Sequence, residues 1–122
     1  MTVAIDFSSL TRHAEVVETF KAGDTVFRAG DAGRRMYVVR SGEVVLLVQD
    51  RPVETVGRGG VVGEMALVDD APRSATAIAR SDCELVPIDD RQFLFLVQQT
   101  PMFALGLMRV LASRLRSMNE RL

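Results

Sequence analysis

The chain contains, at residues 63–76, the stretch Gly63-Glu64-Met65-Ala66-Leu67-Val68-Asp69-Asp70-Ala71-Pro72-Arg73-Ser74-Ala75-Thr76. Its glycine lets the backbone approach a neighbouring group closely, and a carboxylate follows directly. The apolar turn after Glu64 predicts the start of a short helix, whose free N–H groups and positive dipole end favour an anion. Arg73 follows the carboxylate by nine residues and precedes a hydroxyl. The stretch therefore has the parts of an anion-binding site.

Short strands broken by turns precede this stretch. Runs rich in β-branched residues alternate with turn pairs such as Gly23-Asp24 and Gly30-Asp31, in which glycine accepts a positive φ at little cost. Such runs at this interval predict an all-β barrel or roll. The expected strands are residues 16–20, 25–27, 36–39, 44–48 and 53–56.

Two more strands are expected after the stretch. Residues 74–79 alternate polar and apolar side chains, as a half-buried strand does. Residues 84–88 form a last strand, in which Pro87 lacks an N–H and therefore predicts an edge or a bulge. A short helix is expected before the first strand, at residues 8–14.

The period then changes to that of helices. Asp89-Asp90 can cap a helix that runs through Gln98, and Thr100-Pro101 can begin a longer one. On the longer helix an apolar arc about 160° wide exceeds what contact with one surface requires, while Arg114 falls with the polar residues opposite. We therefore expect part of the arc to pack on the roll, and the rest to form a lid, a dimer seam, or both in turn. The arc consists of Leu105, Leu107, Met108, Leu111, Ala112, Leu115, Met118 and Leu122. A heptad seam on the same helix would use Leu105, Met108, Ala112, Leu115, Asn119 and Leu122.

A chain of 122 residues is near the commonest domain size, so a single domain over residues 1–122 is expected. It divides into a short N-terminal helix (1–14), a β-roll (15–89) that includes the 63–76 stretch, and C-terminal helices (90–122). Fifteen Lys and Arg against sixteen Asp and Glu give a net charge of −1. This balance argues against direct DNA binding by the chain, because nucleic-acid domains usually show a basic excess.

Cysteine usage and hydropathy bear on where the protein works. Cys83 is the single cysteine, so no internal disulfide can form and a reducing compartment fits. The N-terminus lacks the basic and apolar regions of a secretory signal. The longest apolar run, residues 44–48, is far shorter than the ~20 residues that span a bilayer. We therefore expect a soluble, cytoplasmic protein without a membrane span.

The sequence shows no catalytic constellation. His13 is the single histidine, whereas a metal-dependent roll enzyme or a phosphodiesterase needs a cluster of histidines and carboxylates. The acidic neighbours of Cys83 disfavour a reactive thiolate. We expect no enzyme activity, no metal site and no cofactor.

The 63–76 stretch resembles the phosphate-binding cassette of cyclic nucleotide-binding domains, which occur in protein kinase A regulatory subunits, cyclic nucleotide-gated channels and the bacterial catabolite activator family. Two earlier segments, residues 22–31 and 36–44, resemble the front-half signature of the same family. Two separate signatures in the right order make the match specific. The resemblance implies a mainly β fold with flanking α: an eight-stranded antiparallel β-roll, or jelly-roll-like barrel, with an inserted cassette helix and C-terminal helices.

The resemblance also assigns roles to the polar groups of the cassette. Arg73 and the backbone N–H groups of Ala66 and Ser74 would bind a cyclic phosphate, and Gly63 would permit the close approach. Glu64 would accept a hydrogen bond from the ribose 2′-hydroxyl. Taken alone, Arg73 would be a surface cation beside two aspartates, and Glu64 would be a helix-start residue facing water. The cassette context favours the ligand roles.

The base of such a ligand needs apolar contact. The candidates are Val61, Val62 and Met65 beside the glycine, and Val44 or Leu46 in the roll. Each of them is also a normal core residue. In the family, the position of Ser74 bears on the choice between adenine and guanine; its serine favours cyclic AMP, with cyclic GMP as the alternative.

We therefore expect a regulatory domain that binds a cyclic nucleotide reversibly, re-docks its C-terminal helix and acts on an unidentified protein effector. A homodimer through that helix is one form the output can take. The alternatives are a cyclic GMP sensor, the ligand-binding module of a larger transcription regulator or channel, and a roll that has lost its ligand. The presence of both Glu64 and Arg73 disfavours the last.

Overall fold

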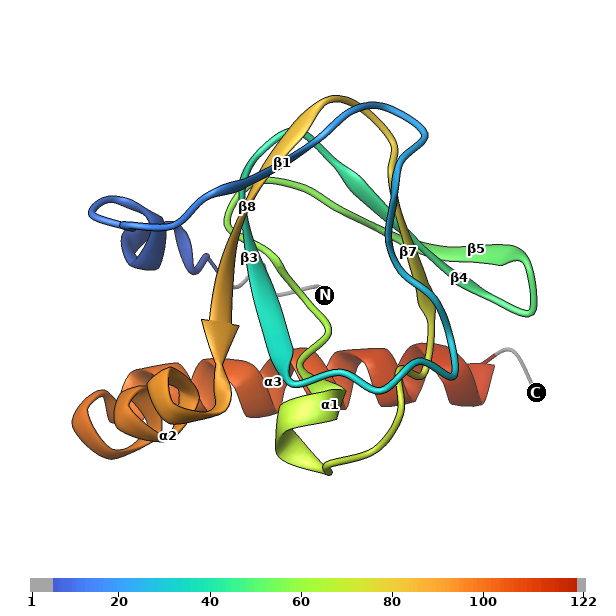
Figure 1. Cartoon of the computed structure of the whole chain (residues 1–122). Coiled ribbons are helices and arrows are strands. Elements are labelled where there is room, and N and C mark those ends of the chain that lie inside the picture. Colours follow the sequence, from blue (N-terminus) through green and yellow to red (C-terminus); the bar gives the residue numbers. More distant parts are fainter. Residues whose placement is uncertain (1–5, 121–122) are drawn as a thin grey trace.

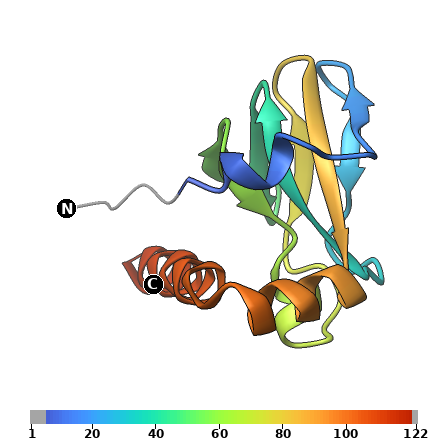
Figure 2. The ribbon, with the colours of Figure 1, turned by 90° about the vertical axis from the view of Figure 1, so that its left-hand side faces the viewer.

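The computed structural model describes residues 6–120 of the chain. This part contains eight antiparallel strands in two four-stranded sheets, ordered β1-β8-β3-β6 and β2-β7-β4-β5. The sheets form the roll in Figure 1, and Figure 2 shows the α-helices together at one end of it. The strands are β1 (Glu18–Phe20), β2 (Thr25–Phe27), β3 (Arg35–Ser41), β4 (Val44–Val48), β5 (Arg51–Val56), β6 (Val61–Val62), β7 (Thr76–Ala79) and β8 (Cys83–Asp89). The helices are the 3-10 helix η1 (Ser8–Thr11), α1 (Met65–Val68), α2 (Asp90–Gln99) and α3 (Pro101–Glu120).

The predicted eight-stranded antiparallel roll is confirmed, as two sheets rather than a closed barrel. The sequence pattern does not predict β6, because two adjacent buried valines show no alternation. The prediction of an edge or a bulge at Pro87 is confirmed locally, although β8 as a whole lies between β1 and β3. β1 pairs with β8 only as far as Leu85, so Pro87 has a paired strand on one side alone.

β3 is buried on both faces and separates two apolar cores. Tyr37 and Val39 belong to the core inside the roll, whereas Met36 and Val38 pack with the helices. β6 continues the division, since Val62, paired with Tyr37, joins the roll core and Val61 joins the helix core. The cassette follows β6 directly, so it begins where the two cores meet.

Local chemistry determines where the helices begin. The Asp89 carboxylate accepts a hydrogen bond from the Gln92 backbone N–H at 2.8 Å, and the Gln92 side chain accepts from the Asp89 N–H at 2.9 Å. This capping box confirms the predicted start of α2. α3 begins at Pro101, as predicted. The helix expected at residues 8–14 is a single 3-10 turn, and residues 1–5 of the predicted N-terminal segment lie outside the described part.

The predicted apolar arc of α3 divides between two environments. Leu107 is 3% exposed and packs in the helix core, whereas Met108 and Leu115 are 62% and 60% exposed. Leu122 lies outside the described residues. The solvent-facing side of α3, called here the α3 stripe, carries Met102, Leu105, Met108, Ala112, Leu115 and Met118.

In the described part of the chain, no single helix is long and apolar enough to cross a membrane. Helices α2 and α3 together have the required length and composition, but the chain bends by 113° between them. The described residues contain no group of three or more His, Cys, Asp or Glu side chains placed to hold a metal ion.

Candidate functional site

The cassette begins at a turn that requires glycine. Gly63 has a φ of +80°, and a Cβ at this position would lie 2.5 Å from Nη1 of Arg73 and 3.2 Å from the Phe27 ring. Any side chain would therefore clash with the cassette arginine and strain the backbone. α1 follows at once, and the N–H groups of Met65 and Ala66 at its start have no acceptor within so short a helix.

Arg73 is buried, with 8% of its surface exposed. Its guanidinium carbon lies 4.2 Å from the centre of the Phe27 ring, and Nη1 donates a hydrogen bond to the Gly63 carbonyl at 3.1 Å. Its backbone is also held, because its N–H donates to the Asp31 carbonyl and its carbonyl accepts from the Gly30 N–H, each at 2.8 Å. The interpretation of Arg73 as a surface cation does not fit this placement.

Among the side chains of residues 6–119, no carboxylate forms an ion pair with Arg73. Burial lowers the pKa of Arg73, since removal from water disfavours the charged form, while Asp31 and Glu64 act in the opposite direction. An arginine nevertheless stays protonated at neutral pH. The site thus contains a buried positive charge that has no anionic partner in direct contact.

Glu64 is also buried, at 2% exposed, but it is paired. Its carboxylate accepts a hydrogen bond from Nη1 of Arg114 on α3, and it makes no capping bond to α1. Arg114 also binds both carboxylate oxygens of Glu54 on β5, at 2.9 and 3.2 Å, and the Val61 carbonyl at 2.7 Å. One side chain therefore ties α3 to β5, to β6 and to the cassette. The interpretation of Glu64 as a residue facing water does not fit this arrangement.

The charge balance at Arg114 is favourable. Burial acts to lower the pKa of Arg114, but Glu64 and Glu54 outweigh it, so the pKa is raised. A guanidinium can serve two carboxylates and a carbonyl at once because its five N–H donors lie in one plane.

A family model of the cyclic nucleotide-binding domain matches residues 17–100, which include both sheets, the cassette and α2. The chain belongs to the cyclic nucleotide-binding domain family.

Members of this family with known roles resemble the chain over most of its length. The cyclic AMP receptor protein of Thermus thermophilus is 37% identical over 102 residues, 80% of this chain and 47% of that protein. The cGMP-dependent protein kinase of Plasmodium berghei is 35% identical over 72 residues, 59% of this chain and 8% of that protein. The crystal structure of the T. thermophilus catabolite activator protein matches with a TM-score of 0.79 and 34% identity, over 87% of this chain and 52% of that one. The chain thus spans about half the length of the bacterial relative and a small part of the kinase.

The remaining predicted site residues of this cyclic nucleotide-binding domain are spread over different environments. Met65 is 38% exposed, Ser74 is exposed and Ala66 is buried. Val62 lies in the roll core, as do Val44 and Leu46, whereas the Val61 side chain packs in the helix core. Gly63 and Arg73 are in direct contact, while the Glu64 carboxylate turns toward α3.

Sequence reasoning missed Arg114, Glu54 and Phe27. The prediction that Arg114 belongs to the polar face of α3 is wrong, because its charged end enters the site. A usable signal was present, since Phe103, Leu107, Val110 and Arg114 follow one another at spacings of three and four residues on the side of α3 that packs inward. Glu54 and Phe27 carry no such signal, because their contacts with Arg114 and Arg73 form only when the sheets, the cassette and α3 pack together.

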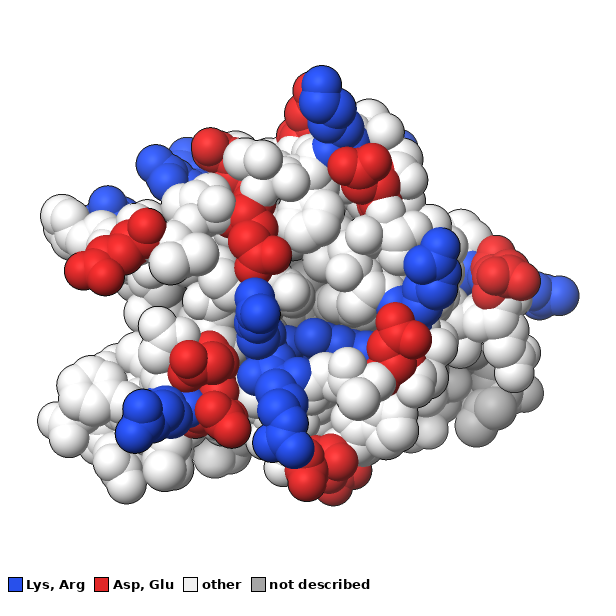
Figure 3. Space-filling view, in the orientation of Figure 1, with Lys and Arg blue, Asp and Glu red and all other residues white. Residues whose placement is uncertain are grey.

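One further cation, Arg35, lies near Arg73. In Figure 3, Lys and Arg side chains gather at the hollowed centre of the face that carries α1 and the start of β3. Arg35, the first residue of β3, is near enough to act on Arg73 and to lower its pKa further. Arg35 is paired with Glu18 at 3.2 Å and is exposed, so solvent screens its effect.

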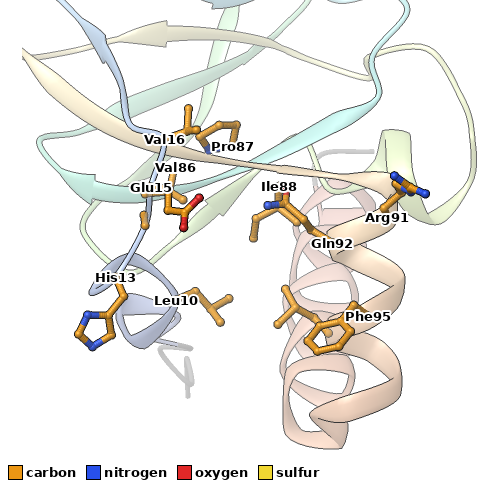
Figure 4. Close-up of a pocket in the computed structure, with 12 residues that line it drawn as sticks. Leu10, His13, Glu15, Val16, Val86, Pro87, Ile88, Arg91, Gln92 and Phe95 are labelled. Atoms are coloured by element: carbon orange, nitrogen blue, oxygen red, sulfur yellow. The ribbon is translucent and has the colours of Figure 1, made fainter.

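A separate open pocket of about 610 Å³ lies between η1, β8 and α2. Leu10, Ile88 and Phe95 face it in Figure 4, and His13 stands at its rim. No cassette residue lines it, so it is distinct from the Arg73 site.

Proposed function

We propose that this domain binds cyclic AMP through Arg73 and uses the ligand as a regulatory signal. The observation that carries the proposal is the buried Arg73 guanidinium, which has no carboxylate partner among the described residues. A cyclic phosphate carries one negative charge and two free oxygens, which match the planar donors of a guanidinium. The N–H groups of Ala66 and Ser74 would complete the contact.

Glu64 would accept a hydrogen bond from the ribose 2′-hydroxyl, which is the one sugar hydroxyl that the cyclic phosphate leaves free. Arg114 already occupies this carboxylate, so the ligand and α3 would share or compete for it. Binding would therefore change how firmly Arg114 holds α3 to the cassette. A ligand shifts such a balance only if its affinity for the two helix positions differs.

The preference for cyclic AMP rests on Ser74. Ser74 is exposed next to Arg73, where a base could reach it. Relatives named for cyclic AMP and for cGMP both resemble the chain at 35% identity or more. Val62, Val44 and Leu46 in the roll core, with Met65, would supply the apolar contacts of the base.

The α3 stripe would carry the output, as the seam of a homodimer. Leu105, Met108, Ala112, Leu115 and Asn119 are all exposed and follow heptad spacing. An apolar stripe of this length favours a partner helix over water. Two copies joined there could pass a movement of α3 from one site to the other or to a protein effector.

Titration calorimetry with cyclic AMP, cyclic GMP and adenosine tests the ligand assignment. We expect cyclic AMP to bind most tightly and adenosine, which lacks the phosphate, to bind far more weakly. Incubation with cyclic AMP and divalent metal ions should leave the nucleotide intact, because the proposed role is binding. Absence of heat with both cyclic nucleotides would refute the proposal, and steady formation of AMP would refute the non-enzymatic role.

Light scattering tests the seam. Met108→Glu combined with Leu115→Glu should convert a dimer to a monomer, because two charges would be buried against their copies. Ser113→Glu, on an exposed position outside the stripe, is the matched control and should leave the mass unchanged. A wild-type protein that is monomeric with and without ligand would contradict this part alone.

A further inference from the structure

The Arg73 guanidinium lies in a narrow slot, and the groups that form the slot have not been given a role in ligand binding. The guanidinium carbon Cζ lies over the Phe27 ring, 4.2 Å from the ring centre, and Nη1 donates a hydrogen bond to the Gly63 carbonyl. The Gly33 backbone closes the slot, because a Cβ there would clash with Nε, Cζ and Nη2 of Arg73. The guanidinium is thus confined by the Phe27 ring, the Gly63 carbonyl and the Gly33 backbone.

A register shift in the sheet directs the Phe27 ring toward Arg73. Phe27 ends β2, where the pairing with β7 shifts register between Thr25 and Phe27. A bulge of this kind re-aims a side chain, and Val26 and Phe27 accordingly both pack against the roll core. The ring is further supported by Tyr37, with ring centres 6.4 Å apart and planes at 22°.

We propose that Phe27 is a positioning residue of the phosphate site, which holds the Arg73 guanidinium flat so that its in-plane N–H donors point at the ligand. The inference rests on the proposed function. A cation over an aromatic face is attracted to the ring quadrupole, more strongly where water is excluded. Stacking uses the face of the guanidinium and leaves the edge free, so the ring supports the charge without consuming donors.

Phe27 also affects the electrostatics of the site. No carboxylate among the described side chains contacts Arg73, so the ring attracts the buried charge but does not neutralise it. An ion pair in the same place would hold Arg73 equally well but would weaken its attraction for a phosphate. Phe27 therefore positions the arginine while leaving its charge available.

The chain offers a matched control for this inference. Phe20 packs against the same roll core, and no ring contact with Arg73 involves it among the described residues. Phe27→Leu and Phe20→Leu remove the same aromatic group from the same core. Both should lower the thermal midpoint, whereas only Phe27→Leu should weaken cyclic AMP binding, by roughly tenfold.

Two further variants separate positioning from packing. Phe27→Tyr keeps the ring and should bind within about twofold of wild type. In an Arg73→Lys background, Phe27→Leu should cost less than about threefold, because an ammonium does not stack as a plate. If Phe27→Leu does not fold, Phe27→Met keeps the volume and carries the same expectation.

The outcomes distinguish this inference from the function on which it rests. Wild-type protein that binds neither cyclic nucleotide overturns the proposed function and this inference with it. Wild-type binding with equal affinity in Phe27→Leu, or an equal loss in Phe20→Leu, overturns the inference alone. An undiminished Phe27→Leu effect in the Arg73→Lys background also overturns it, since the ring would then act by another route.

Discussion

Glu64 and Arg73 are both more than nine-tenths buried and both belong to the cassette, but their charges have different partners. Glu64 is neutralised within the chain by Arg114. Arg73 is supported by a ring and a carbonyl and keeps its charge. The difference indicates a division of labour, in which the Arg73 end is prepared for an anion and the Glu64 end is coupled to a helix.

The comparison also separates stability from binding. An unpaired buried charge lowers stability, so Arg73 should contribute little to folding and much to ligand affinity. A buried pair that loses one member leaves an uncompensated charge, so the Glu64 end should contribute mainly to folding. Four variants test that division.

Arg114→Ala should have the largest effect. It leaves Glu64 buried without its cation and should lower the free energy of unfolding by ~3–5 kcal/mol. Urea denaturation of the ligand-free protein measures this change. Hydrogen exchange should show faster opening of α3, which loses its link to β5, β6 and the cassette. Wild-type stability in this variant would contradict a stabilising role for the Glu64–Arg114 pair.

Arg73→Ala should cost ~2–4 kcal/mol of cyclic AMP binding, because a desolvated phosphate loses its charged donor. The same substitution should change the midpoint of urea denaturation far less than Arg114→Ala does. Calorimetry and denaturation on one preparation provide both readouts. A large loss of stability with unchanged affinity would reverse the comparison between the two charges.

Glu64→Ala should weaken cyclic AMP binding by about 1.5 kcal/mol, because the hydrogen bond from the ribose 2′-hydroxyl to a charged carboxylate is lost while Arg114 keeps Glu54 as a partner. A ligand that lacks the 2′-hydroxyl, 2′-deoxy cyclic AMP, should bind wild type and this variant with nearly the same affinity. A clear preference of the variant for cyclic AMP over the deoxy analogue would show that another group reads the ribose.

Glu54→Gln should have the smallest effect. The side chain of Glu54 is 40% exposed, so its ion pair with Arg114 is screened and should contribute less than ~1 kcal/mol to stability. Affinity for cyclic AMP should not change measurably. This variant is the control for Arg114→Ala. An equal loss of stability in both variants would show that Arg114 stabilises the fold through Glu54 of β5 and not through Glu64 of the cassette.

Features that depend on neighbours in the chain could be predicted from the sequence. The strand and turn pattern determined most of the roll, and the Asp89–Gln92 capping box determined where α2 begins. The cassette could be predicted for the same reason, since Gly63, Glu64 and Arg73 lie within eleven residues of one another. Such signals are local because hydrogen bonding and φ preferences act over a few residues.

The partners of the two buried charges depend on the packing of distant parts of the chain. Arg114 lies 50 residues from Glu64 and 60 from Glu54, and Phe27 reaches Arg73 through a bulge in β2. The sequence shows a polar residue on a helix and an aromatic residue in a strand, each of which has many partners available. In the folded protein, Glu64 is buried against Arg114 of α3 and Arg73 is buried against Phe27. The physical reason is that pairing at such separations depends on which surfaces meet, and no local preference encodes that.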